Sequence, residues 1–74
     1  MRKVIEREYR RLGLEPLEGD QWVVDRRDLR LHGPYRPGDG VLQARNLNDF
    51  VAGTMGTDAP FFVLDAQGRS IPRD

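Results

Sequence analysis

The stretch PFFVLDAQGRSIP, residues 60–72, gives the strongest structural signal in this chain of 74 residues. Its aromatic and β-branched start predicts a strand, Gly68 predicts a tight turn, and a short second strand follows. Bulky side chains would lie on both faces of the first strand. We therefore expect either that the domain covers both faces itself or that a partner or a second copy of the chain covers one of them.

At the other end of the chain, residues 2–12, RKVIEREYRRL, predict an amphipathic helix. Its apolar side chains fall in one arc at the helical spacing, and Gly13 suits the position just after the last turn. Glu8 lies inside the apolar arc. If it turns toward Arg11, its i+3 neighbour, its carboxylate stays in water.

Two strands are predicted after this helix. Residues 21–25, QWVVD, have a β-rich centre without helical period. Residues 28–32, DLRLH, alternate and would place Leu29 and Leu31 on one side of a second strand. A short helix capped by Asp25 is the competing interpretation. In the strand interpretation, the two arginines between the segments would form the turn, although arginine is unusual in a two-residue hairpin turn.

Residues 33–40, GPYRPGDG, predict a loop, because two prolines lack backbone donors and three glycines permit unusual backbone angles. Residues 41–45, VLQAR, then predict a strand. Residues 46–56, NLNDFVAGTMG, predict a short helix with Asn46 or Asn48 as its N-cap.

These elements give the order α-β-β-β-α-β-β in a single domain over residues 1–74. We expect a small α+β fold, in which the N-terminal helix and a short second helix pack on one face of a mainly antiparallel sheet of four to five short strands. A chain this short has a thin core.

Composition excludes several classes of protein. The chain is 38% hydrophobic and 32% charged, which is too apolar for a disordered tail and too polar for a membrane span. The longest apolar run, APFFVL, is far shorter than a transmembrane helix, and no apolar segment of a secretory signal follows the basic N-terminus. No cysteine is present. We therefore expect a soluble, cytoplasmic protein with no membrane partner.

Enzymatic chemistry finds little support in the sequence. His32 is the only histidine and Ser70 the only serine, and the surroundings of Ser70 lack the G-x-S-x-G pattern. Metal-binding and phosphate-binding loop patterns are also missing. We expect no enzyme, and we assign no catalytic, cofactor-binding or metal-binding residue. A catalytic role for His32 is the simplest version of the enzyme hypothesis.

The charged residues balance at twelve basic and twelve acidic, yet they alternate in blocks along the chain. Within the N-terminal helix, Lys3, Arg7, Arg10 and Arg11 fall within about 100° of each other, opposite the apolar arc. This face could bind phosphates or an acidic protein surface. A solvated helix face without a partner is the simpler interpretation.

Residues 33–40 are the other candidate site. Tyr35 and Arg36 sit between two prolines, which would restrict the loop and present both side chains at low entropic cost. Tyrosine and arginine are also enriched at interface hot spots. In the simpler interpretation the loop only connects two elements and Tyr35 folds back onto the core.

The leading hypothesis is a small non-enzymatic protein–protein interaction module that docks on a larger protein. Accessory, regulatory and inhibitor proteins, including those of phages and mobile elements, have this size. The expected contact residues are Tyr35, Arg36, Lys3, Arg7, Arg10 and Arg11. The alternative is a nucleic-acid-binding module that uses the same helix with the basic segment 26–36. The net charge of zero argues against this alternative. A second copy of the chain is a further candidate partner.

Overall fold

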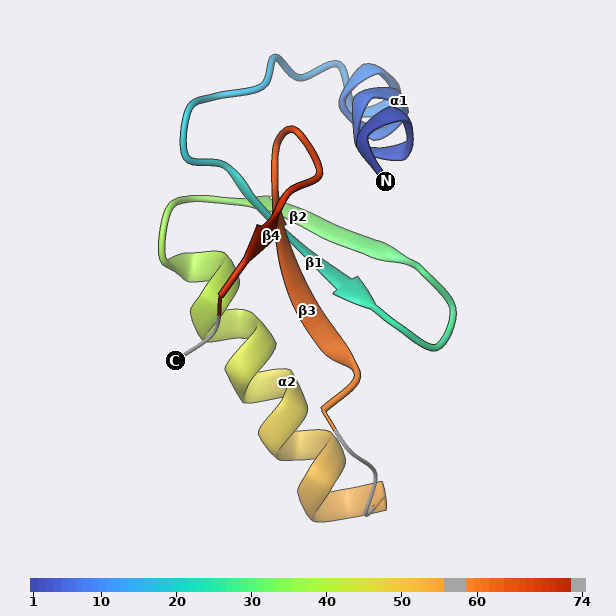
Figure 1. The fold of residues 1–74 in the computed structure, drawn as a ribbon, viewed down its shortest axis with the longest axis vertical. Helices are drawn as coiled ribbons and strands as arrows, with labels where there is room; N and C mark the ends of the chain where they lie inside the picture. The colour runs from blue at the N-terminus through green and yellow to red at the C-terminus, as the bar shows by residue number, and fades with distance from the viewer. Residues whose placement is uncertain (56–58, 73–74) are drawn as a thin grey trace.

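The computed structural model describes residues 1–55 and 59–72, which form two helices and one antiparallel sheet of four strands. The elements are α1 (Arg2–Leu12), β1 (Gln21–Asp25), β2 (Leu31–Tyr35), α2 (Asp39–Met55), β3 (Phe61–Asp65) and β4 (Ser70–Ile71). The strands lie in the order β2-β1-β3-β4 (Figure 1). The predicted α+β fold with an antiparallel sheet of four to five strands is confirmed, although the third of the five strands in the predicted order does not form.

The two helices cover opposite faces of the sheet, so the prediction that both pack on one face is wrong. Side chains alternate along the central strands β1 and β3. Trp22, Val24 and Leu64 form a core with α1, whereas Val23 and Val63 form a second core with α2. Because both central strands carry bulky residues on both faces, each face needs its own helix.

Helix α1 matches its prediction over residues 2–12. Ile5 and Tyr9 are its buried side chains, and Gly13 ends the helix in the left-handed conformation at φ 69°. The Arg11 side chain donates hydrogen bonds to the Glu8 carboxylate, one of them from Nε at 3.0 Å. The predicted i+3 pair therefore forms.

Helix α2 begins at Asp39, so the predicted strand over residues 41–45 is wrong. The amide of Val41 donates to Oε1 of Gln21 on β1 at 3.1 Å, which satisfies one free donor of the first turn. The segment 41–45 is too short to show the helical spacing of buried residues. That spacing becomes visible only when Ala44, Asn48 and Val51 are considered together, because they form the buried face of α2. The predicted N-caps Asn46 and Asn48 both lie inside the helix, and residue 56 of the predicted helix lies outside the described residues.

Strand β2 runs through Gly33 and Pro34, which the sequence placed in a loop. The strand lies at the edge of the sheet, where the missing N–H of a proline removes no ladder hydrogen bond. The Gly33–Pro34 peptide bond is cis, and the register with β1 shifts between Gln21 and Val23. Tyr35 is therefore a strand residue, and the connection to α2 is shorter than expected.

The turn between β1 and β2 spans residues 26–30, not the two arginines alone. The Leu29 amide donates to the Asp25 carbonyl at 2.7 Å, and Leu29 adopts a φ of 60°. Its side chain is exposed, so it does not join Leu31 on one face of a strand as predicted. Strand structure begins only at Leu31, and no helix forms over residues 26–30.

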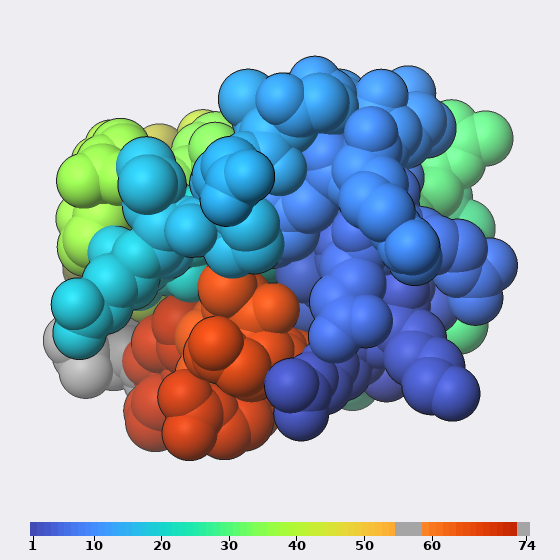
Figure 2. Space-filling view, turned by 90° about the horizontal axis from the view of Figure 1, so that it is seen from above, coloured from blue at the N-terminus to red at the C-terminus, as the bar shows by residue number. Residues whose placement is uncertain are grey.

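The β3–β4 hairpin confirms its prediction and also packs beside α1. Gly68 adopts a φ of 83°, as the tight turn requires. A Cβ atom at Gly68 would lie only 2.9 Å from the backbone nitrogen of Arg2. Figure 2 shows this turn (orange) against the start of α1 (dark blue), with the β1–β2 hairpin (green) on the other side of the helix.

Candidate interaction surface

The outer face of α1 carries a stripe of cations that have no ionic partner. Lys3, Arg7 and Arg10 follow at the i, i+4, i+7 spacing, and all three are exposed. No carboxylate of residues 1–55 and 59–72 forms an ion pair with them. We call these three residues the basic stripe. Unpaired cations in one row retain their full charge for an external anionic surface.

Arg11 lies at the border of the basic stripe and differs from it. Its guanidinium hydrogen-bonds Glu8 and lowers the pKa of that carboxyl. Arg2 likewise bonds Glu6, with 3.3 Å between Nε and Oε1. Of the four predicted basic residues on α1, three therefore remain unpaired among the described residues.

A groove separates α1 from the β1–β2 hairpin. It has a volume of about 440 Å³ and is open to solvent. It is lined by Val4, Glu8, Arg11, Leu29, Arg30, Leu31 and His32. We call it the α1–hairpin groove. Val4 and Leu29 are 40% and 58% exposed, so the groove offers apolar surface to a partner.

The groove and the basic stripe form one continuous surface. A second shallow hollow on α1 joins Val4 to Arg7 and Arg10. The two hollows are lined by four cations, Arg7, Arg10, Arg11 and Arg30, and by one anion, Glu8. Four cations against one anion leave a local charge of +3 in a chain with a net charge of zero. The surface is therefore basic and partly apolar.

Tyr35 and Arg36, the predicted contact pair of the loop, do not join this surface. Tyr35 is half-buried and packs against the core beneath α2. Arg36 reaches back to the buried carboxylate of Asp20, with 3.7 Å between Nη1 and Oδ1. Asp20 also accepts a hydrogen bond of 2.7 Å from the hydroxyl of Tyr9, on the buried side of α1. Tyr35 is thus held by its own domain, whereas the Arg36 side chain stays 63% exposed, as predicted, but lies away from the basic stripe.

This Tyr9–Asp20 contact fixes α1 to the segment that leads into β1. The amide of Leu17 donates to the same Asp20 carboxylate oxygen at 3.0 Å. Burial of Tyr9, together with the hydrogen bond to Asp20, raises the pKa of the phenol to about 12. The position of α1, and with it that of the basic stripe, therefore depends on a buried polar contact.

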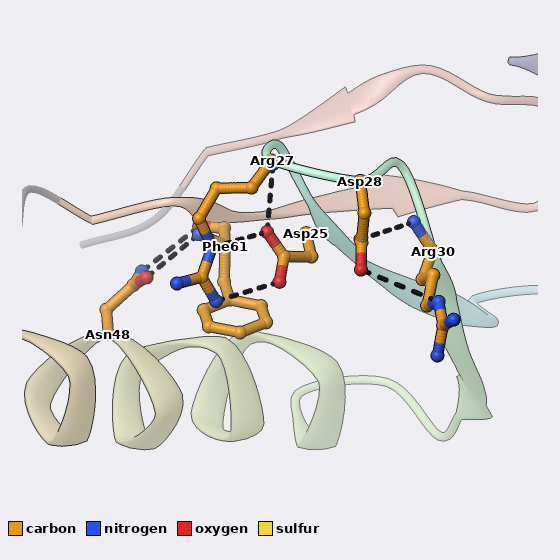
Figure 3. A network of polar contacts seen from close by, with 6 residues as sticks. All are labelled: Asp25, Arg27, Asp28, Arg30, Asn48 and Phe61. Carbon is orange, nitrogen blue, oxygen red and sulfur yellow. Dashed lines mark hydrogen bonds and ion pairs between the residues drawn. The ribbon is translucent and has the colours of Figure 1, made fainter.

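Three of the four arginines of segment 26–36 have an acidic neighbour within the domain. Arg27 donates to both carboxylate oxygens of Asp25, at 3.1 and 2.9 Å, and its guanidinium lies 5.7 Å from the centre of the Phe61 ring (Figure 3). These bonds lower the pKa of Asp25. Arg30 pairs with Asp28 at 3.5 Å. In this segment the positive charge is therefore offset by neighbouring carboxylates at Arg27, Arg30 and Arg36, whereas Arg26 forms no ion pair among the described residues.

His32, the single histidine, lies on the exposed side of β2. Its ring is exposed and lies edge-on to Phe61, with 6.3 Å between the ring centres. Residues 1–55 and 59–72 contain no cluster of three or more potential metal ligands. The described helices also include none that is long and apolar enough to cross a membrane.

A larger hollow, of about 820 Å³, opens between α2 and the ends of β3 and β4. Asn48 is the buried polar residue among those that line this hollow, and its side chain already makes hydrogen bonds within the protein. The Asn48 amide donates to the Phe61 carbonyl at 3.0 Å, and its Oδ1 accepts from the Phe61 amide at 2.9 Å (Figure 3). Among the described residues, β4 pairs with Val63 and Leu64, and the Asn48 side chain bonds the backbone of Phe61 at the start of the same strand.

Sequence reasoning found the basic stripe but missed the groove beside it. Val4 was assigned to the buried arc of the helix and Leu29 to a buried strand face. In the folded chain, Val4 and Leu29 are 25 residues apart in sequence, yet both are exposed and line the same groove.

Comparison of the chain with protein-family models, curated proteins and solved structures finds no match.

Proposed function

We propose that this protein is a non-enzymatic docking module that binds an acidic and partly apolar surface of a larger protein. The contact residues are the basic stripe on α1 and the adjoining α1–hairpin groove. Such a protein acts as an accessory, regulatory or inhibitory subunit by occupying the surface of its partner.

The observation that supports this proposal most strongly is the unpaired state of Lys3, Arg7 and Arg10 among the described residues. Cations without internal partners complement an acidic surface and accelerate its capture. The exposed side chains of Val4 and Leu29 add apolar area that loses water on binding. A partner that matches both features carries carboxylates around one or two apolar side chains.

The same geometry disfavours nucleic acid as the partner. Phosphate binding depends on the number of free cations. In segment 26–36, however, Arg27, Arg30 and Arg36 each form an ion pair within the domain. Apolar residues beside the stripe also offer nothing to a phosphate backbone.

Two matched charge reversals separate these possibilities. Arg10→Glu changes the basic stripe, whereas Arg26→Glu changes an exposed arginine that belongs only to the nucleic-acid surface. Each variant is used as tagged bait in native lysate, with and without nuclease, and recovered proteins are quantified by mass spectrometry. The proposal expects a stoichiometric partner that survives nuclease, is retained by Arg26→Glu, and is lost with Arg10→Glu.

A third variant tests the groove. Val4→Ser keeps the charge and replaces exposed apolar surface, so it should weaken binding to the identified partner in calorimetric titration. Recovery that is unaffected by both Arg10→Glu and Val4→Ser contradicts the proposal. Recovery that collapses with nuclease, together with salt-sensitive binding of a labelled DNA or RNA oligonucleotide, favours the nucleic-acid alternative.

A further inference from the structure

Helix α2 presents an apolar face to solvent on the side opposite its core contacts. Leu42 and Phe50 are 53% and 66% exposed, the latter the largest exposed fraction among the large apolar side chains that the structure describes. They lie two helical turns apart, with the exposed Asn46 halfway between them. Ala44 and Val51 occupy the buried side of the same helix. The outer face is therefore not required for the core of its own domain.

This face is complementary to itself in an antiparallel arrangement. Asn46 is four residues from Leu42 and four residues from Phe50. If two α2 helices pack antiparallel about a twofold axis at Asn46, each Leu42 meets Phe50 of the second copy, and the two Asn46 side chains meet each other. A twofold interface uses the same patch on both subunits, and a central asparagine pair fixes the register of paired helices.

The charges beside the apolar face follow the same symmetry. Arg45 and Asp49 lie on one flank of α2, and neither forms an ion pair with another described residue. In the antiparallel pair, both flanks lie on the same side of the seam, in the axial order Asp49, Arg45, Arg45, Asp49 with the two copies alternating, so each Arg45 lies beside Asp49 of the other copy and the two Arg45 residues adjoin at the centre. In a parallel pair, these flanks would lie on opposite sides of the seam. Two ion pairs therefore favour the antiparallel arrangement.

From this pattern we propose that the protein forms a homodimer through an antiparallel pair of α2 helices centred on Asn46. The occupant of the α2 face is a second copy of the chain. A seam of one helix pair falls below the size of a standard stable interface, so the dimer is weak and depends on concentration. The α1 surface lies on the opposite side of the sheet (Figure 1) and takes no part in it.

Sedimentation velocity over a concentration series tests the dimer on the full chain. We expect the sedimentation coefficient to rise from monomer to dimer with concentration. Phe50→Ser should raise the dissociation constant by about tenfold or more, because an aromatic anchor is lost. Arg45→Asp should also weaken the dimer through repulsion from Asp49 of the second copy. The double variant Arg45→Asp/Asp49→Arg should restore it.

All three positions are exposed, so circular dichroism should show an unchanged fold in these variants. A wild-type chain that stays monomeric at all concentrations overturns the proposal. A dimer that is indifferent to Phe50→Ser, or one that the double variant fails to restore, places the interface elsewhere and overturns it equally.

Cysteine cross-linking provides an independent measurement, since the natural chain has no cysteine. Helices that pack at about 8–10 Å, each with a Cα radius of about 2.3 Å, leave facing Cα atoms roughly 4–5 Å apart, near the range for a disulfide. Asn46→Cys should therefore yield a covalent dimer under mild oxidation. Ala52→Cys, exposed on the same helix but away from the seam, should not. Equal cross-linking of both variants contradicts the geometry.

Because Arg10→Glu leaves α2 unchanged, docking and dimerisation can fail independently.

Discussion

Replacing Asn48 with alanine removes the side chain that bonds the backbone at the start of β3. Asn48 is 8% exposed, and its carboxamide makes both hydrogen bonds to the backbone of Phe61. Phe61 is itself buried, so water does not readily replace the lost partner. Alanine would remove both of these hydrogen bonds at the same point.

The size of the effect follows from these two hydrogen bonds. A typical intramolecular hydrogen bond contributes about 0.5–1.5 kcal/mol to stability. Two of them contribute about 1–3 kcal/mol, and the better helix propensity of alanine returns roughly 0.5 kcal/mol. A domain of this length has a total stability of only about 4–11 kcal/mol. We therefore expect Asn48→Ala to lower the free energy of unfolding by about 1–2 kcal/mol and Tm by roughly 5–15 °C.

Urea unfolding followed by the fluorescence of Trp22, the single and fully buried tryptophan, measures this loss. Asn46→Ala is the matched control, because it makes the same change at an exposed site of the same helix. Dilute protein keeps self-association out of the comparison. If the two variants differ by less than about 0.5 kcal/mol, the reasoning about the Asn48–Phe61 hydrogen bonds is refuted.

Three further predictions concern the buried polar contacts. Tyr9→Phe should lower the free energy of unfolding by about 1–3 kcal/mol in urea denaturation, because the hydroxyl bonded to buried Asp20 is lost; Tyr35→Phe, with no such bond described, should change it little. Because the pKa of Tyr9 rises from 10.0 to about 12, the stabilisation from its protonated hydroxyl is complete below pH 10 and falls as pH rises toward 12. Thermal unfolding of the wild type across this range should show this loss of stability, and an equal loss in a Tyr9→Phe variant would contradict the assignment to Tyr9. Since Arg27 lowers the pKa of Asp25, that pair contributes above the unfolded value of 3.8 and is lost as pH falls; acid unfolding of Arg27→Ala should lack this component.

The elements that sequence predicted correctly are those whose signals are local. The period of α1 and its terminal Gly13 are contained in twelve consecutive residues, and the hairpin at Gly68 needs only its own turn. The start of α2 was missed because part of its stabilisation comes from Gln21, twenty residues earlier. The second strand was predicted over residues 28–32, whereas β2 runs over Leu31–Tyr35, because Pro34 is acceptable only on a sheet edge and strand order is not visible in the sequence.

The candidate site also combines features that local sequence predicts with features that depend on long-range packing. Helical spacing placed Lys3, Arg7 and Arg10 on one face, and the structure adds that they lack ionic partners among the described residues. The sequence favoured Arg36 as an exposed contact residue. Its attachment to Asp20 depends on how the segment before β1 folds. Long-range packing therefore determined which cations remain free.

The placement of the two helices on opposite faces of the sheet has a consequence for binding strength. A dimer joined through α2 would carry two identical α1 surfaces that point away from the shared seam. Such a particle can bridge two partner molecules or grip one partner at repeated acidic sites. In the second case, one arm rebinds before the other releases, so avidity exceeds the affinity of either arm without any new contact.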